Sequence, residues 1–131
     1  KGQNTMFRVD DKLKELAEQV MSERPDLKKL ANPDCRIAYL RCDKKKTSHG
    51  RTVFADTEKV GEKAKTLAQV DFIITFYDPA CASLSEEKMK VLMIHELKHI
   101  GFEPGKPFTI IPHDVEDFKE IIETYGMDWT I

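Results

Sequence analysis

The sequence predicts an α+β fold in which a small mixed or antiparallel sheet is covered by helices. Its 131 residues are enough for one domain. Several segments repeat apolar residues at helical spacing, and short β-prone segments lie between them. We therefore expect residues 1–131 to form a single domain with helices packed on one sheet.

The composition is that of a globular protein. Hydrophobic residues make up 40% of the chain and charged residues 34%, which excludes a disordered chain. The longest apolar runs, such as 72–74 and 91–94, are far too short to cross a bilayer, so no membrane segment is expected. The net charge of -2 gives no overall attraction for nucleic acid, so a nucleic-acid partner is not expected from the charge.

The cysteines suggest a reducing compartment. Cys35, Cys42 and Cys81 are odd in number and lack the spacing of a zinc knuckle. No apolar stretch follows the charged start of the chain, so no secretory signal is visible. We expect reduced thiols and a cytoplasmic location.

A first helix is expected from Asp10 to Met21, where apolar residues recur at intervals of three and four before Pro25. Two β-prone segments, 36–41 and 52–55, then flank a basic, glycine-containing loop. Because this loop joins them directly, they are expected to pair as a hairpin. Residues 56–70 are expected to form a connection with at most one helical stretch.

The segment 72–77 is apolar at successive positions, which predicts a strand buried on both faces. A helix is expected next, from about residue 85 to 100. Ser83 and Glu86 have the spacing of a capping box at its start, and Gly101 is placed to cap its end. A run of four apolar residues within it predicts a central helix with most of its surface covered.

The last part of the chain is expected to hold a short strand and a helix. Residues 108–111 are β-prone, and a new helical pattern starts at Pro112 and ends at Gly126. Its apolar positions are Val115, Phe118, Ile122 and Tyr125.

Chemistry is concentrated in the segment His95-Glu96-Leu97-Lys98-His99. Residues four apart lie on one face of a helix, so His95 and His99 can bind the same ion. Zinc suits such a pair, because it binds imidazole nitrogens at about 2.0–2.1 Å. Glu96 is about 100° further round the helix, where it could accept a proton from a zinc-bound water. Imidazoles also accept cobalt, nickel or copper, and zinc is favoured by the motif and by its availability.

A third protein ligand is expected, because a catalytic zinc keeps one position open for water. His113 is the first candidate, since the loop before it is long enough for the chain to turn back; helix capping is its alternative role. His49 lies in the charged loop far upstream. Carboxylates could replace a histidine, and the candidates are Glu103, Glu116 and Glu120. Asp114 and Asp117 could orient an imidazole or simply favour a helix start.

No residue is assigned to stabilise charge on a substrate. The tyrosines could donate a hydroxyl, but core packing is the simpler role for each of Tyr39, Tyr77 and Tyr125. The basic loop from Lys44 to Arg51 could contact phosphate or an acidic partner, although a solvated turn is the simpler explanation.

The motif at 95–99 and the segment 112–118 together resemble the putative phage metallopeptidase family. Further likeness lies in Ala38–Arg41, Asp71–Ile74 and Tyr125–Trp129. That family is similar to SprT-like zincins, so the resemblance implies a zincin-like fold and a phage or prophage origin in a bacterial host.

The resemblance also implies a set of site residues: zinc on His95, His99 and His113, with Glu96 as the base. The sequence departs from that of metzincins, because Gly105 stands where their third histidine would fall. In zincins the strand before the metal helix lies near a sheet edge that pairs with the substrate. By that likeness the hairpin 37–55 is the expected edge, and a peptide would bind as an added strand.

These observations support a zinc-dependent metallopeptidase that acts on a peptide or protein substrate. The alternative is a catalytically silent, metal-stabilised protein-binding module of phage or prophage origin, in which a protein side chain fills the fourth zinc position. Nucleic-acid binding by the basic loop is a weaker third hypothesis.

Overall fold

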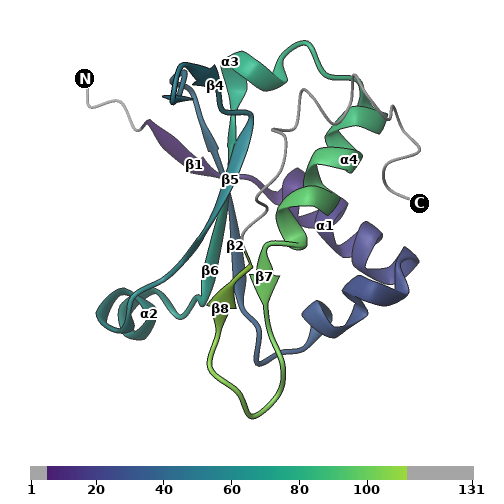
Figure 1. Cartoon of the computed structure of the whole chain (residues 1–131), viewed down its shortest axis with the longest axis vertical. Helices are drawn as coiled ribbons and strands as arrows, with labels where there is room; N and C mark the ends of the chain where they lie inside the picture. The colour runs from purple at the N-terminus through teal and green to yellow at the C-terminus, as the bar shows by residue number, and fades with distance from the viewer. Residues whose placement is uncertain (1–5, 112–131) are drawn as a thin grey trace.

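The computed structural model describes residues 6–111, which form a four-stranded mixed sheet with α1 and α4 on one face (Figure 1). The order of strands is β1-β2-β6-β5. β1 (Phe7–Val9) is antiparallel to β2 (Ile37–Cys42), which is parallel to β6 (Phe72–Tyr77). β6 is antiparallel to β5 (Ala55–Lys59). The predicted α+β class is confirmed.

β6 is the centre of the sheet and confirms the strand predicted to be buried on both faces. Phe72, Ile74 and Phe76 have no exposed surface and belong to the core under the helices. Successive side chains of a strand point to opposite faces, so Thr75 and Tyr77 lie on the other side, where they are also buried. This apolar strand therefore takes the central place in the sheet.

The predicted hairpin between 36–41 and 52–55 is wrong, because β6 lies between β2 and β5. Only the tip of the loop folds back on itself, where β3 (Thr47–Ser48) pairs with β4 (Arg51–Thr52). β2 is paired on both sides and cannot be the edge expected to receive a peptide. Among the described strands of this sheet, β5 and β1 are the two edges.

The prediction that residues 56–70 form only a connection is also wrong, because they include a strand. Most of β5 lies within this segment, and α2 (Glu62–Ala68) follows. The sequence of β5 is largely polar, but a strand at the edge of a sheet needs only its inward residues to be compatible with burial. Ala55 and Thr57 are such half-buried positions, whereas Glu58 and Lys59 are exposed.

The first helix is confirmed as α1 (Asp11–Glu23), which continues to the 3-10 helix η1 (Pro25–Ala31). Asp10 caps α1 by accepting a hydrogen bond from the Leu13 amide at 2.9 Å. The buried stripe of α1 is Leu13, Ala17, Val20 and Met21. This stripe packs α1 against α4 and the sheet.

α4 (Glu86–Leu97) follows the short helix α3 (Asp78–Cys81) and is central, as predicted. All seven residues from Val91 to Leu97 are buried. Its capping residue is Ser85, whose hydroxyl accepts from the Lys88 amide at 3.2 Å, so the prediction of a capping box at Ser83 is wrong. Within the part of the chain that is described, no helix has the length and hydrophobicity to span a membrane.

Gly101 does not cap α4, which ends three residues earlier than predicted. Gly101 lies in β7 (Ile100–Gly101), which pairs with β8 (Thr109–Ile110). β8 is the middle part of the strand expected at 108–111. A Cβ atom on Gly101 would overlap the Thr109 hydroxyl oxygen and stand 3.0 Å from the Thr109 main-chain oxygen, so this close pairing favours glycine. The helix predicted from Pro112 to Gly126 lies outside the described residues.

The three cysteines are free and buried. Burial raises the pKa of the Cys35 and Cys81 thiols to about 11, which keeps both protonated at neutral pH. They are therefore packing residues of the core.

Candidate metal centre

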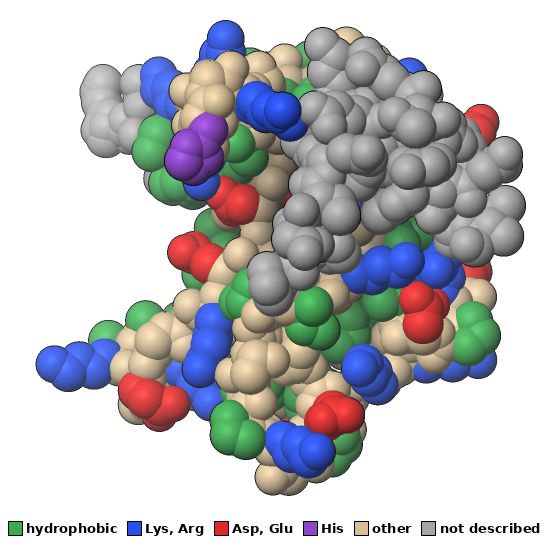
Figure 2. Space-filling model, viewed as in Figure 1, with side chains coloured by type: hydrophobic (Ala, Val, Ile, Leu, Met, Phe, Trp, Pro, Cys, Tyr) green, Lys and Arg blue, Asp and Glu red, His purple; other side chains and the backbone are tan. Residues whose placement is uncertain are grey.

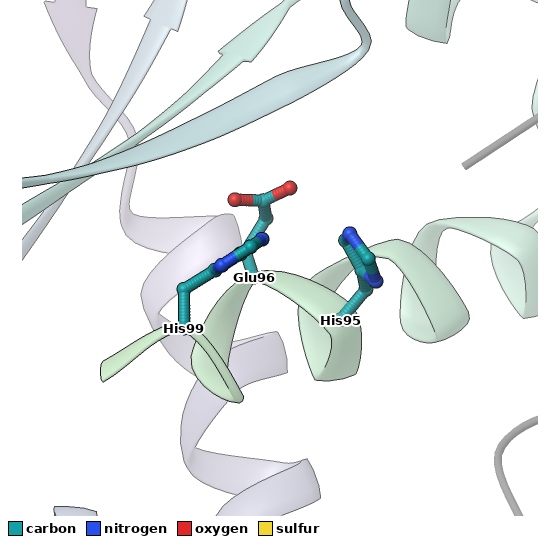
Figure 3. Close-up of side chains that lie close together, drawn as sticks. All are labelled: His95, Glu96 and His99. Carbon is teal, nitrogen blue, oxygen red and sulfur yellow. The ribbon is translucent and has the colours of Figure 1, made fainter. Parts of the chain in front are cut away.

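The histidine motif lies where α4 ends against the edge strand β5. His95 and Glu96 are in the last turn of the helix, and His99 lies two residues beyond it. Figure 3 shows the three side chains projecting toward the same side. One ligand atom from each residue lies within 4.8 Å of the other two. This is the only such cluster of histidine, cysteine and carboxylate groups within residues 6–111.

The two imidazoles are held in different orientations. Their ring centroids are 5.0 Å apart and the ring planes are at 88°. His95 is 7% exposed and Glu96 is 3% exposed, whereas His99 is partly exposed. A polar group so little exposed has few water partners, so a bound cation would interact strongly with it.

A cleft of about 490 Å³ opens onto these residues. One wall is the segment from Arg51 to Thr57, which leads through β4 into β5, and the other is formed by α4 and Ile110. A larger cavity of about 610 Å³ lies between α1, η1 and β2, but it contains none of the motif residues. The smaller cleft is therefore the one with reactive groups.

The Glu96 carboxylate is buried and held by Thr57 on β5. The Thr57 hydroxyl oxygen is 2.7 Å from Glu96 Oε1 and 3.1 Å from the Glu96 main-chain oxygen. Burial raises the pKa of Glu96 to about 7; the Thr57 hydrogen bond opposes this shift and the charge of Asp56 adds to it. A carboxyl group of this pKa can both take up and release a proton near neutral pH.

The His99 ring is fixed by the main chain of Ile111. Its Nδ1 donates a hydrogen bond to the Ile111 carbonyl oxygen at 2.8 Å. Because that carbonyl can only accept, the proton of the neutral ring is on Nδ1 and Nε2 has the lone pair available for a metal. Burial lowers the pKa of His99, which favours this neutral form.

The sequence pattern of the family described as putative phage metallopeptidase matches residues 5–130. The chain belongs to this family. No curated protein and no solved structure matches it. Membership of a metallopeptidase family implies a metal ion and a peptide or protein substrate, and the donor set of two imidazoles and a carboxylate suits a divalent metal such as zinc.

Within residues 6–111, the other candidate residues from the sequence do not join this centre. His49 is exposed in the turn between β3 and β4 and is not part of the cluster. Glu103 is 63% exposed and pairs with Lys106. Tyr39 is packed in the core, and the Tyr77 hydroxyl donates to Asp56 at 2.8 Å. The remaining candidates lie outside the described residues: His113, Asp114, Glu116, Asp117, Glu120 and Tyr125.

The basic loop contributes the turn β3–β4 beside the cleft. One of its lysines, Lys46, is paired with Asp56 of β5, so part of its charge is neutralised within the protein. On the face seen in Figure 2, Lys and Arg side chains are interspersed with Asp and Glu. The loop is thus not part of a continuous basic surface on that face.

Two residues that shape the centre were missed in the sequence: Thr57 and Ile111. Thr57 is part of the polar segment Ala-Asp-Thr-Glu-Lys, whose alternation places Ala55 and Thr57 on one face. That alternation is the only sequence signal for Thr57. Ile111 acts through its main chain, which leaves no signal in its side chain.

Proposed function

We propose that this member of the phage metallopeptidase family is a zinc-dependent peptidase that hydrolyses peptide bonds. One observation carries the proposal: a buried Glu96 carboxylate lies within 4.8 Å of ligand atoms of His95 and His99, beside an open cleft. Two imidazoles to hold zinc and a neighbouring carboxylate to move a proton are the parts that metal-assisted hydrolysis needs.

His113 is proposed as the third zinc ligand, together with His95 and His99. Ile111 is hydrogen-bonded to His99, and His113 follows it by two residues. Two residues span at most about 7 Å. The attachment of Ile111 beside the metal centre therefore supports a histidine within reach of the same ion.

Glu96 would act as the general base and then as the general acid. Zinc, when bound, would lower the pKa of a water ligand towards about 7 and polarise the substrate carbonyl. Glu96 would accept the proton that the attacking water loses as its oxygen bonds to the carbonyl carbon. It would then give that proton to the leaving amine as the carbon–nitrogen bond breaks. In the metal-free protein, burial raises the pKa of Glu96, which favours the uptake of a proton.

We propose that the substrate binds in extended form along β5. This strand is an edge of the sheet, and its residues Ala55, Asp56 and Thr57 line the cleft. The free main-chain groups of an edge strand can pair with a peptide, which adds one strand to the sheet. In this proposal β5, and not the hairpin 37–55, is the sheet edge that binds the peptide.

The biological setting follows from the family. We propose a single domain over residues 1–131, encoded by a phage or prophage, that acts in the cytoplasm of a bacterial host. Its substrate would be a peptide or protein of that setting.

The decisive experiment replaces Glu96 by glutamine and measures zinc content and peptide hydrolysis together. Glu96→Gln keeps the size of the side chain but cannot take up the proton. We expect zinc content to stay at the parent level and hydrolysis to fall about 10²- to 10⁴-fold, the usual contribution of a general base. Glu103→Gln, the same change at an exposed glutamate, is the matched control.

Parent-like hydrolysis by Glu96→Gln would refute the assignment of the base. If the parent binds zinc but cleaves no peptide, and its zinc has four protein ligands, the protein is instead a metal-stabilised binding module. X-ray absorption at the zinc edge distinguishes the two coordination sets.

A further inference from the structure

Thr57 joins the edge strand to the metal-binding helix at one residue. Its hydroxyl lies 2.7 Å from Glu96 Oε1 and 3.1 Å from the Glu96 main-chain oxygen. The hydroxyl has one proton, so it can donate to only one of these oxygens at a time. The shorter distance favours the carboxylate, which is therefore fixed toward β5.

The Glu96 carboxylate is close enough to the two histidines to be a metal ligand itself. Its nearest suitable oxygen lies within 4.8 Å of a ligand atom of each imidazole. Carboxylate oxygen is a common zinc ligand, with bonds of about 2.0–2.2 Å. A carboxylate bound to zinc would occupy the position that catalysis leaves for water. It would also no longer be available to accept a proton.

Glu96 is also too deeply buried to remain charged without a partner. It is 3% exposed, and a buried carboxylate needs a hydrogen-bond donor or a cation. Asp56 on β5 carries a charge of the same sign, so it cannot be that partner. With the Thr57 hydroxyl removed, the metal would be the strongest remaining partner for the carboxylate.

We propose that Thr57 is a positioning residue that keeps the Glu96 carboxylate out of the metal's ligand set. This inference rests on the proposed function, since it concerns the division of roles between metal ligand and base. The hydrogen bond from β5 holds one carboxylate oxygen and leaves the group beside the ion.

The test uses the 131-residue protein loaded with cobalt(II) or zinc and compares three variants. Thr57→Val removes the hydroxyl and keeps a β-branched side chain that suits a strand. Thr57→Ser restores the hydroxyl. Thr75→Val makes the same chemical change at a buried position of β6 that does not line the cleft.

We expect only Thr57→Val to change the metal site. Its cobalt(II) visible bands should shift in position and intensity, because a carboxylate oxygen replaces the water ligand. Zinc affinity should rise about 10- to 100-fold, the range over which residues next to ligands affect metal sites. Peptide hydrolysis should fall through kcat, with KM little changed. Thr57→Ser and Thr75→Val should resemble the parent.

A second replacement identifies the new ligand. In the double variant Thr57→Val, Glu96→Gln, the uncharged amide should restore the parent's cobalt spectrum. Thr57→Ala provides a second hydroxyl-free protein if valine prevents folding. The proposal is overturned if hydroxyl-free variants keep the parent's cobalt spectrum and zinc affinity. Because these measurements use no peptide, they remain decisive even if the parent shows no hydrolysis.

Discussion

His99 and Ile111 hold each other through two hydrogen bonds. The His99 ring donates from Nδ1 to the Ile111 carbonyl oxygen at 2.8 Å, and the Ile111 amide donates to the His99 carbonyl oxygen at 2.6 Å. Ile111 directly follows β8, so the pairing of β7 with β8 sets the position of an imidazole that is proposed to bind the metal. The site therefore depends on residues that touch neither the metal nor the substrate.

Gly101→Ala should weaken both the fold and the metal site. The added Cβ would overlap the Thr109 side chain and stand 3.0 Å from the Thr109 main-chain oxygen, so it would push β8 away and move Ile111 from His99. We expect a loss of about 1–3 kcal/mol in the free energy of unfolding and zinc binding that is about 10- to 100-fold weaker. Urea unfolding and zinc titration measure the two effects.

The matched control is Gly61→Ala, because a Cβ there would meet nothing within 4 Å. That variant should bind zinc like the parent. If Gly101→Ala also bound zinc like the parent, the link from β7–β8 to His99 would be unimportant for the metal.

His113→Ala should reduce zinc affinity more than His49→Ala. His49 is exposed in the turn between β3 and β4 and lies outside the cluster of ligands, whereas His113 follows Ile111 by two residues. Removing one of the three proposed protein ligands should weaken zinc binding by at least about 100-fold, since zinc sites rely on a nearly complete ligand set. Competition with a chromogenic chelator gives both affinities. The reverse order would assign the third ligand to His49.

The stability of the metal-free protein should depend on Glu96 between about pH 4.5 and 7. The folded protein raises the pKa of Glu96 from 4.5 to about 7, so in this range it holds a proton that the unfolded chain has released. Stability from this group is therefore present at low pH and is lost as pH rises through 7, by up to about 3 kcal/mol.

The titration of His99 changes the stability of the metal-free protein in the opposite direction. The folded pKa of His99 is below 6.5, so its contribution increases as pH rises towards that value. Glu96→Gln removes the first effect and keeps the second. Urea unfolding with chelator present should therefore show the parent losing stability relative to Glu96→Gln from pH 4.5 to 7.5. A difference that is constant over this range would contradict the shifted pKa.

Removal of the metal should lower the temperature of unfolding. A ligand that binds only the folded state at 100 times its Kd stabilises it by about 2.7 kcal/mol. For a chain of this size that corresponds to several degrees in Tm. Differential scanning calorimetry with and without chelator should show the shift in the parent and in Glu96→Gln, and no shift in His95→Ala. An equal shift in His95→Ala would point to a metal bound elsewhere.

Strong local patterns made much of this fold predictable from sequence. The spacing of Leu13, Ala17 and Val20 correctly predicted α1, and the unbroken apolar run of β6 identified the central strand. The motif at 95–99 was recognisable because two histidines and a glutamate at helical spacing have few structural uses. These signals are contained within single elements.

The errors concern relations between elements. β2 and β5 were expected to pair because they are neighbours in sequence, but the burial of β6 between them is more favourable than a local hairpin. Gly101 was interpreted as a helix cap, whereas its need for glycine comes from Thr109 on the partner strand. Thr57 was missed because its role depends on Glu96, 39 residues later in the chain.

The parallel pairing of β2 with β6 also bears on the order of folding. Arg36 and Asp71, at the start of the two strands, are hydrogen-bonded although they are 35 residues apart. The chain must close this long loop before the centre of the sheet is formed, which makes the step slow. α4 packs on that sheet, so the metal centre should assemble after the rate-limiting step. A bound ion should then slow unfolding and leave the refolding rate almost unchanged.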